Sequence, residues 1–132
     1  MRYNYIAPIL ISPHNSNVLY HGANVLLRSD FRGKNWVEIS PDLSNQKICG
    51  DDGKVWGTIS SIDESPIKQG LLWVGTDDGN IHLTKDDGKT WTKISDNFPE
   101  HLKDMHVSRV VASHHSTQKA YVSFLGARSN FD

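Results

Sequence analysis

The chain has 132 residues, 37% of them hydrophobic, which is enough for one small domain with a modest core. Its formal net charge is −1 and its Lys and Arg residues do not cluster, so we expect neither a nucleic-acid partner nor a polybasic membrane-binding segment. No apolar run approaches the roughly 20 residues that cross a bilayer, so we expect no membrane insertion, and the single cysteine, Cys49, leaves no intrachain disulfide.

Three segments of the chain repeat one pattern. Residues 11–20, 64–73 and 112–121 align without gaps, and each has Ser at its second position, turn-forming polar residues in its middle and an aromatic residue at its end. The match continues backwards, where 6–9 aligns with 59–62 and 107–110, and forwards, where 33–40 aligns with 88–95. A period of about 50 residues is typical of stacked repeat architectures.

Four short strands are predicted for each repeat, because runs of β-branched and aromatic residues alternate with Gly, Pro, Asn, Asp and Ser. In chain order they cover residues 6–10, 18–21, 25–28 and 36–39, then 58–62, 71–75, 81–84 and 91–94, then 107–112 and 120–124. No window has a sustained helical period with caps. The pattern predicts an all-β fold of four-stranded antiparallel β-propeller blades.

The predicted blades form a single segment over residues 1–132. The first blade covers about 6–40, the second about 57–95, and a partial third about 107–132, which makes an incomplete ring of about two and a half blades. Such a ring leaves strand edges unpaired, and open edges pair with other chains. We therefore expect self-association, with the third blade completed by the strands of another chain or packed on another copy.

The clearest motif lies between the third and fourth strands of the second repeat. Residues 84–91 read Thr-Lys-Asp-Asp-Gly-Lys-Thr-Trp and fit the Asp-box pattern Ser/Thr-x-Asp-x-Gly-x-x-Trp, beginning at Thr84. Asp86 can accept hydrogen bonds from backbone N–H groups of its own turn, and Gly88 can adopt a positive φ without strain. Trp91 begins the outer strand and can fill the gap to a neighbouring strand or blade. The motif predicts a structural turn and not a catalytic centre.

The first repeat contains a degraded copy of this motif. Ser29, Gly33 and Trp36 are in register, but Phe31 stands where the pattern requires Asp. Two interpretations stay open: the turn is held differently, with the adjacent Asp30 as a substitute, or it is weaker.

These motifs resemble those of the large bacterial BNR-repeat proteins that are labelled glycosyl-hydrolase-like and are related in fold to the sortilin-type propellers. The resemblance covers nearly the whole chain, and its matching stretches are residues 5–14, 27–29, 33–36, 39–44, 57–59, 64–66, 70–80, 107–110 and 113–115. It implies a longer, exported protein, periplasmic or extracellular, with one or two many-bladed propellers. Fold alone does not imply function, so an enzymatic activity is not implied for this chain by itself.

One residue is a candidate catalytic group. The segment Gly-Thr-Asp-Asp-Gly at 75–79 resembles the segment that carries a catalytic aspartate, here Asp77, in xyloglucan-cleaving propeller enzymes. A two-carboxylate mechanism requires a partner about 5–10 Å away, and the sequence nominates none. The alternative is an ordinary hairpin turn. A sialidase-like arginine triad is not met, because among the five arginines only Arg109 lies on a predicted innermost strand.

No cofactor and no metal site are expected. His106, His114 and His115 are close in sequence but have no flanking ligands at metal-binding spacing. The Asp-Asp-Gly stretch at 51–53 lacks the alternating acidic positions of a calcium loop.

Three functional hypotheses remain. The first is a binding or interaction scaffold for a glycan or protein ligand, with the connector 40–56 as its most variable surface. The second is a fragment of a xyloglucanase-like or sialidase-like glycoside hydrolase that is inactive alone. The third is a purely structural fragment.

Overall fold

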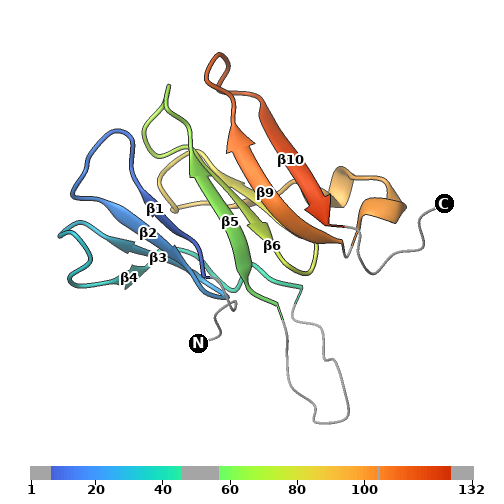
Figure 1. Ribbon diagram of the computed structural model, residues 1–132, viewed down its shortest axis with the longest axis horizontal. Coiled ribbons are helices and arrows are strands. Elements are labelled where there is room, and N and C mark those ends of the chain that lie inside the picture. The colour runs from blue at the N-terminus through green and yellow to red at the C-terminus, as the bar shows by residue number, and fades with distance from the viewer. Residues whose placement is uncertain (1–6, 46–56, 104, 126–132) are drawn as a thin grey trace, which may run out of the picture.

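A computed structural model describes residues 7–45, 57–103 and 105–125, which form three antiparallel sheets (Figure 1). The first sheet has the order β1 (Ile9–Ile11), β2 (Leu19–Gly22), β3 (Leu26–Ser29), β4 (Val37–Glu38). The second has the order β5 (Ile59–Glu64), β6 (Leu72–Thr76), β7 (Ile81–Thr84), β8 (Thr92–Lys93). The third pairs β9 (His106–Ala112) with β10 (Ala120–Leu125).

The all-β antiparallel prediction is confirmed, and each predicted strand is present within a few residues of its expected bounds. Within each sheet, the strands follow one another as up-and-down hairpins, joined by short turns rich in Gly, Asn or Ser. Between β8 and β9 the chain forms two short 3₁₀ turns, η1 (Ser95–Asn97) and η2 (Glu100–Leu102), that the sequence pattern did not predict. In the described ranges there is no α-helix.

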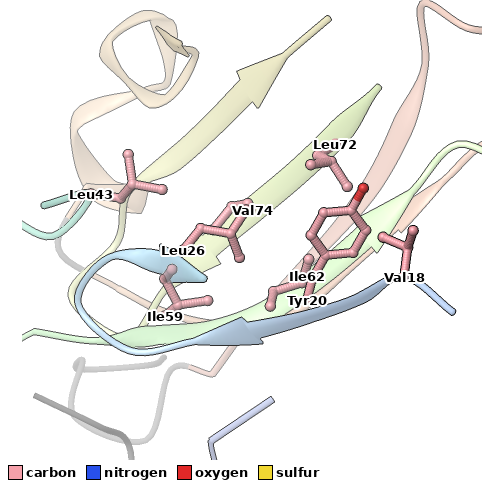
Figure 2. Packing of buried hydrophobic residues seen from close by; sticks show 8 residues of the cluster. All are labelled: Val18, Tyr20, Leu26, Leu43, Ile59, Ile62, Leu72 and Val74. Atoms are coloured by element: carbon pink, nitrogen blue, oxygen red, sulfur yellow. The ribbon is translucent and has the colours of Figure 1, made fainter. Parts of the chain in front are cut away.

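The hydrophobic core lies between the sheets. One cluster lies between the first and second sheets and consists of Val18, Tyr20, Leu26, Leu43, Ile59, Ile62, Leu72 and Val74 (Figure 2). A second cluster lies between the second and third sheets and consists of Trp73, Ile81, Val107, Val110 and Ala112. The second sheet is therefore covered on both faces, and all residues of β6 are buried.

Both junctions between sheets are built at equivalent repeat positions. A Cβ placed on Gly22 would lie 2.6 Å from Ile59 Cγ2, and one placed on Gly75 would lie 2.4 Å from Val107 Cγ1. At these distances only glycine fits. The glycine near the end of β2 or β6 thus lets the first strand of the next sheet cross in direct contact with the backbone.

The first strands of the second and third sheets are also linked by polar contacts. Ser61 Oγ accepts a hydrogen bond from the backbone N–H of Val110 at 3.0 Å, and Asp63 Oδ2 accepts one from the N–H of Ala112 at 2.7 Å. These two side chains of β5 provide acceptors for backbone N–H groups on the edge of β9, which would otherwise be buried without a hydrogen-bond partner. β5 and β9 consequently lie side by side (Figure 1).

Candidate functional site

The turn between β7 and β8 is held by the side chains of Thr84 and Asp86. Thr84 Oγ1 accepts a hydrogen bond from Gly88 N at 2.9 Å, while Asp86 accepts bonds from Thr90 N at 2.9 Å and from Thr90 Oγ1 at 2.6 Å. The bond from the Thr90 hydroxyl, followed by those from its N–H and from Thr84, lowers the pKa of Asp86 to about 2. Asp87 and Gly88 have φ angles of 62° and 93°. Asp86 is therefore placed as the acceptor that closes its own turn.

The equivalent turn of the first sheet has the same backbone shape without the aspartate. Arg32 and Gly33 have φ angles of 59° and 95°. Ser29 Oγ accepts bonds from Phe31 N at 3.2 Å and from Gly33 N at 3.0 Å, and it donates to the carbonyl oxygen of Lys34. Ser29 thus provides the side-chain acceptor within the turn, and Asn17 holds Arg32 from the neighbouring β1–β2 turn through its carbonyl oxygen and its side chain.

Asp30 is not the substitute for the missing aspartate. Its carboxylate accepts a hydrogen bond from Arg28 Nε at 2.8 Å, whereas the N–H groups of Phe31 and Gly33 in the turn donate to Ser29. Asn35, at the position equivalent to Thr90, takes a φ of 54°, because no Asp side chain holds its N–H. Asn tolerates this left-handed conformation better than the β-branched Thr would. The first copy is thus a second solution to the same turn.

The β7–β8 turn of the second sheet is attached to the first sheet. Trp91 Nε1 donates to the carbonyl oxygen of Ile39 at 3.0 Å, and the indole packs against the first core cluster. A Cβ on Gly88 would lie 2.7 Å from the same oxygen, so this glycine is also required by close approach. Trp36, the equivalent of Trp91, stacks edge-on against His21 at 5.7 Å and is 37% exposed.

A polar network crosses the same junction. Asp87 accepts a hydrogen bond from Tyr20 Oη at 3.3 Å and forms an ion pair with Arg28 Nη1. Arg28 also lies over the Tyr20 ring, 5.8 Å from its centroid. Two residues of the first sheet are thereby bound to one turn residue of the second.

Glu64 is a buried carboxylate beside this network. Its carboxylate accepts hydrogen bonds from Ser12 Oγ, in the first sheet, and from Gly70 N at 2.9 Å. Burial, and then the nearby charges of Glu64 and Asp87, raise the pKa of Tyr20 well above its ordinary value. Tyr20 and Glu64 are both buried, and each bonds across the junction between the first and second sheets: Tyr20 to Asp87, and Glu64 to Ser12.

Trp73, the equivalent of Tyr20 in the second sheet, differs in one respect. Its indole Nε1 is buried and has no acceptor among the described residues. In the first junction, the corresponding acceptor is Asp87, in a turn between a third and a fourth strand. The described part of the third sheet has no such strands, so Trp73 lacks that acceptor.

Asp77 lies at the opposite end of the sheets, in the β6–β7 turn. Its carboxylate accepts hydrogen bonds from Thr58 N at 3.0 Å and from Thr58 Oγ1 at 2.9 Å, while its own N–H donates to the Thr58 carbonyl at 2.9 Å. The neighbouring carboxylate is that of Asp78, which accepts bonds from Asn45 N at 2.7 Å and Thr76 Oγ1 at 2.6 Å. Burial raises the pKa of Asp78. Both carboxylates are thus engaged in joining chain segments.

The connector after β4 is fixed against the second sheet at this end. The carbonyl oxygen of Leu43 accepts hydrogen bonds from Asn80 Nδ2 at 3.0 Å and from His82 Nε2 at 2.7 Å. Burial lowers the pKa of His82. Beside these residues is a polar hollow of about 70 Å³, whose lining includes Lys93 and Lys103. We name this end, with Asn45, Asp77, Asp78, Asn80 and the two lysines, the connector end.

Other predicted residues are placed as follows. His106 is on β9, and His114 and His115 are in the β9–β10 turn; across the described ranges, no three His, Cys, Asp or Glu side chains are grouped to hold a metal ion. Arg109 is exposed on β9. Cys49 and the 51–53 stretch lie outside the described residues. Within the described part, no helix has the length and apolar character to cross a membrane.

No family model matches the sequence, and no curated protein matches it. The resemblance drawn from the motifs therefore stays an expectation. Glu64 and Asp87 could not be identified from the sequence, because each is a single acidic residue that bonds side chains of another sheet.

Proposed function

We propose that this chain is a segment of an Asp-box repeat β-propeller of the BNR and sortilin-like kind, and that it acts as a binding scaffold for a glycan or protein ligand. The observation that carries the proposal is the repeated junction. Gly22 against Ile59 and Gly75 against Val107 are the same contact made twice, one repeat apart. Sheets that stack through one repeated contact, with the first strands β5 and β9 side by side, support the propeller-blade arrangement that we propose.

The connector end is the proposed ligand-binding end. The opposite end is occupied by hairpin turns whose polar groups bind each other, as Thr84, Asp86 and Thr90 do. At the connector end, Lys93 and Lys103 line a polar hollow with carboxylates and amides close by. Loops on a rigid scaffold are the usual place for binding residues. Amides, carboxylates and ammonium groups are suited to the hydroxyls of a sugar.

The hydrolase alternative gives Asp77 an acid, base or nucleophile role. Both oxygens of this carboxylate accept hydrogen bonds from Thr58, and the adjacent Asp78 is held by Asn45 and Thr76. A retaining or inverting mechanism requires two carboxylates that face a substrate across a gap. The bonds of these two side chains favour a scaffold role over hydrolysis.

A paired assay tests the proposal. Binding of xyloglucan oligosaccharides and sialosides is measured by calorimetry, and release of reducing sugar or sialic acid is measured on the same samples. We expect saturable binding to one glycan class without turnover. The Lys93→Ala/Lys103→Ala variant should weaken this binding at least several-fold, because it removes the cations of the hollow.

Lys119→Ala is the matched control, since Lys119 is exposed in the β9–β10 turn at the other end of the sheets and its replacement should leave affinity unchanged. Turnover by the unmodified chain would replace the scaffold proposal by the hydrolase. Absence of saturable binding to any glycan in the panel would overturn the glycan ligand.

A further inference from the structure

The front face of the first sheet, which is its side away from the second sheet, exposes residues whose equivalents in the other repeats are buried. Ile9 on β1 is 63% exposed, whereas the equivalent residues Ile62 and Val110 are 8% and 2% exposed. Ile11 is exposed in the same way, whereas its equivalent Ala112 is buried. In the second and third sheets these positions are covered by the sheet before them. Among the described residues, none covers the front of the first sheet in this way.

The back face of the third sheet, which is its side away from the second sheet, also exposes residues whose equivalents in the other repeats are buried. Tyr20 and Trp73 are 1% and 8% exposed, because each lies against the sheet that follows it, whereas their equivalent Tyr121 is 67% exposed. Leu125 is also exposed, and it lies on the same side of β10 as Tyr121 because side chains alternate along a strand. Val122 and Phe124 have the opposite orientation and pack against the second core cluster. The uncovered side thus presents the aromatic half of a junction.

We propose that the back of the third sheet of one copy stacks head to tail on the front of the first sheet of a second copy. The two bare faces are the two halves of one junction that the chain already forms twice internally. In the first internal junction, the aromatic Tyr20 covers the aliphatic Ile62 (Figure 2). In the proposed one, Tyr121 would cover Ile9 and Ile11. The proposed contact is heterologous: the back face of one copy meets the front face of another, and two front faces do not meet.

The intermolecular junction is weaker than the internal ones. Ser123 occupies the position of Gly22 and Gly75, and at those glycines an added Cβ would overlap the crossing strand. A serine there must hold the partner sheet farther away. In the first internal junction, Trp91 donates to Ile39 O, which follows the fourth strand of the preceding sheet. Trp36 is the equivalent of Trp91, but the described part of the third sheet, which would stack on it, has no fourth strand to provide such an acceptor. We therefore expect reversible, concentration-dependent association.

This inference rests on the stacked sheets alone and not on ligand binding. A failure to bind glycans would leave it unaffected, and a monomeric chain could still bind glycans at the connector end. The two proposals therefore fail separately.

Complementation of two blocked variants provides the test. Ile9→Lys places a charge on the front face and Tyr121→Lys places one on the back face. Each variant alone should be monomeric in sedimentation velocity, because every junction needs one intact front and one intact back. Mixed together, they should give a 1:1 heterodimer and nothing larger, whereas the unmodified chain should form larger species as concentration rises.

Matched controls make the result unambiguous. Ile67→Lys changes another exposed isoleucine, in the β5–β6 turn, and should associate like the unmodified chain. Ile11→Lys is a second front-face variant should Ile9→Lys unfold, as judged by circular dichroism. An unmodified chain that stays monomeric at all concentrations overturns the proposal, and so does continued self-association of either blocked variant.

Discussion

Trp91 of the second sheet donates its indole N–H to the carbonyl oxygen of Ile39 of the first sheet, 3.0 Å away. This bond places the aromatic residue of the turn motif at the junction between sheets. Its energetic value can be measured. Trp91→Phe keeps most of the apolar contact and removes the donor, so the free energy of unfolding should fall by about 1 kcal/mol.

Trp91→Ala should cost more, about 2–3 kcal/mol, because it also opens a cavity in a half-buried site. Unfolding in urea, followed by circular dichroism, provides the measurement. Trp36→Ala is the control: its indole is more exposed and packs edge-on against His21 of its own sheet, so the loss should stay below about 1 kcal/mol. Equal losses at the two positions would show that Trp91 does not join the sheets.

The two junction glycines should not tolerate a methyl group. Gly22→Ala and Gly75→Ala each force a Cβ into Ile59 or Val107, and we expect each to destabilise the fold by about 1–3 kcal/mol. Ser123→Ala, at the third repeat position, should cost less than about 0.5 kcal/mol in the monomer, because the contact that it loses, between the Ser123 and Ser108 hydroxyls, is exposed and no sheet follows β10 in the described residues. Thermal unfolding of the three variants at low concentration measures the difference. A neutral Gly75→Ala would mean that the sheets can separate without cost.

The degraded Asp-box should be repairable. Phe31→Asp combined with Asn35→Thr restores the residues that, in the second sheet, form the Asp86–Thr90 bonds. Phe31 is exposed, so little packing is lost, and the Asn35 left-handed φ is no longer required. We expect the double variant to gain about 0.5–1 kcal/mol in unfolding free energy. Phe31→Asp alone should gain less, since Asn35 N then points away from the new carboxylate.

Stability should fall on mild acidification because of His82. Burial lowers the pKa of His82 in the folded chain below its ordinary value near 6.5, and the charge of Lys93 lowers it further. The hydrogen bond to Leu43 and the charge of Asp96 raise the pKa, but the net shift is downward. The unfolded chain therefore binds a proton before the folded chain does. The stability contribution is fully present above about pH 6.5 and is lost as the pH falls from there towards the folded pKa.

His82→Gln keeps a donor for the Leu43 carbonyl and does not titrate, so it should flatten part of this pH dependence. His21, whose pKa burial also lowers, accounts for a further part. His101→Gln, an exposed position, is the control. Urea midpoints measured between pH 7 and pH 5 decide the matter, and an unchanged slope in His82→Gln would contradict the prediction.

Asp77 can be tested as a structural clamp. Asp77→Asn and Thr58→Val each remove part of the same set of hydrogen bonds, and each should cost about 0.5–1.5 kcal/mol. Because the two residues are bonded to each other, the double variant should cost less than the sum of the two. If Asp77 is instead catalytic, Asp77→Asn abolishes any measured turnover while Thr58→Val preserves most of it.

Strand positions and turns were predictable from the sequence because they depend on local chemistry. The Asp-Gly and Arg-Gly pairs at 87–88 and 32–33 impose their φ angles within a few residues, and the alternation of β-branched residues marks the strands. The 3₁₀ turns η1 and η2 were missed, since each is a single short turn without a periodic pattern. The candidate Asp77 was correctly located in a turn, but its partner Thr58 was not foreseen.

The sequence by itself determined the repeat, its period and the hairpin order, because repeated residues build repeated local structure. Only the tertiary structure decided which side chains meet across sheets: Glu64 with Ser12, and Asp87 with Tyr20 and Arg28. These partners are more than 50 residues apart and depend on how one sheet stacks on the next. Stacking is set by close packing at positions such as Gly22, and no local pattern encodes it.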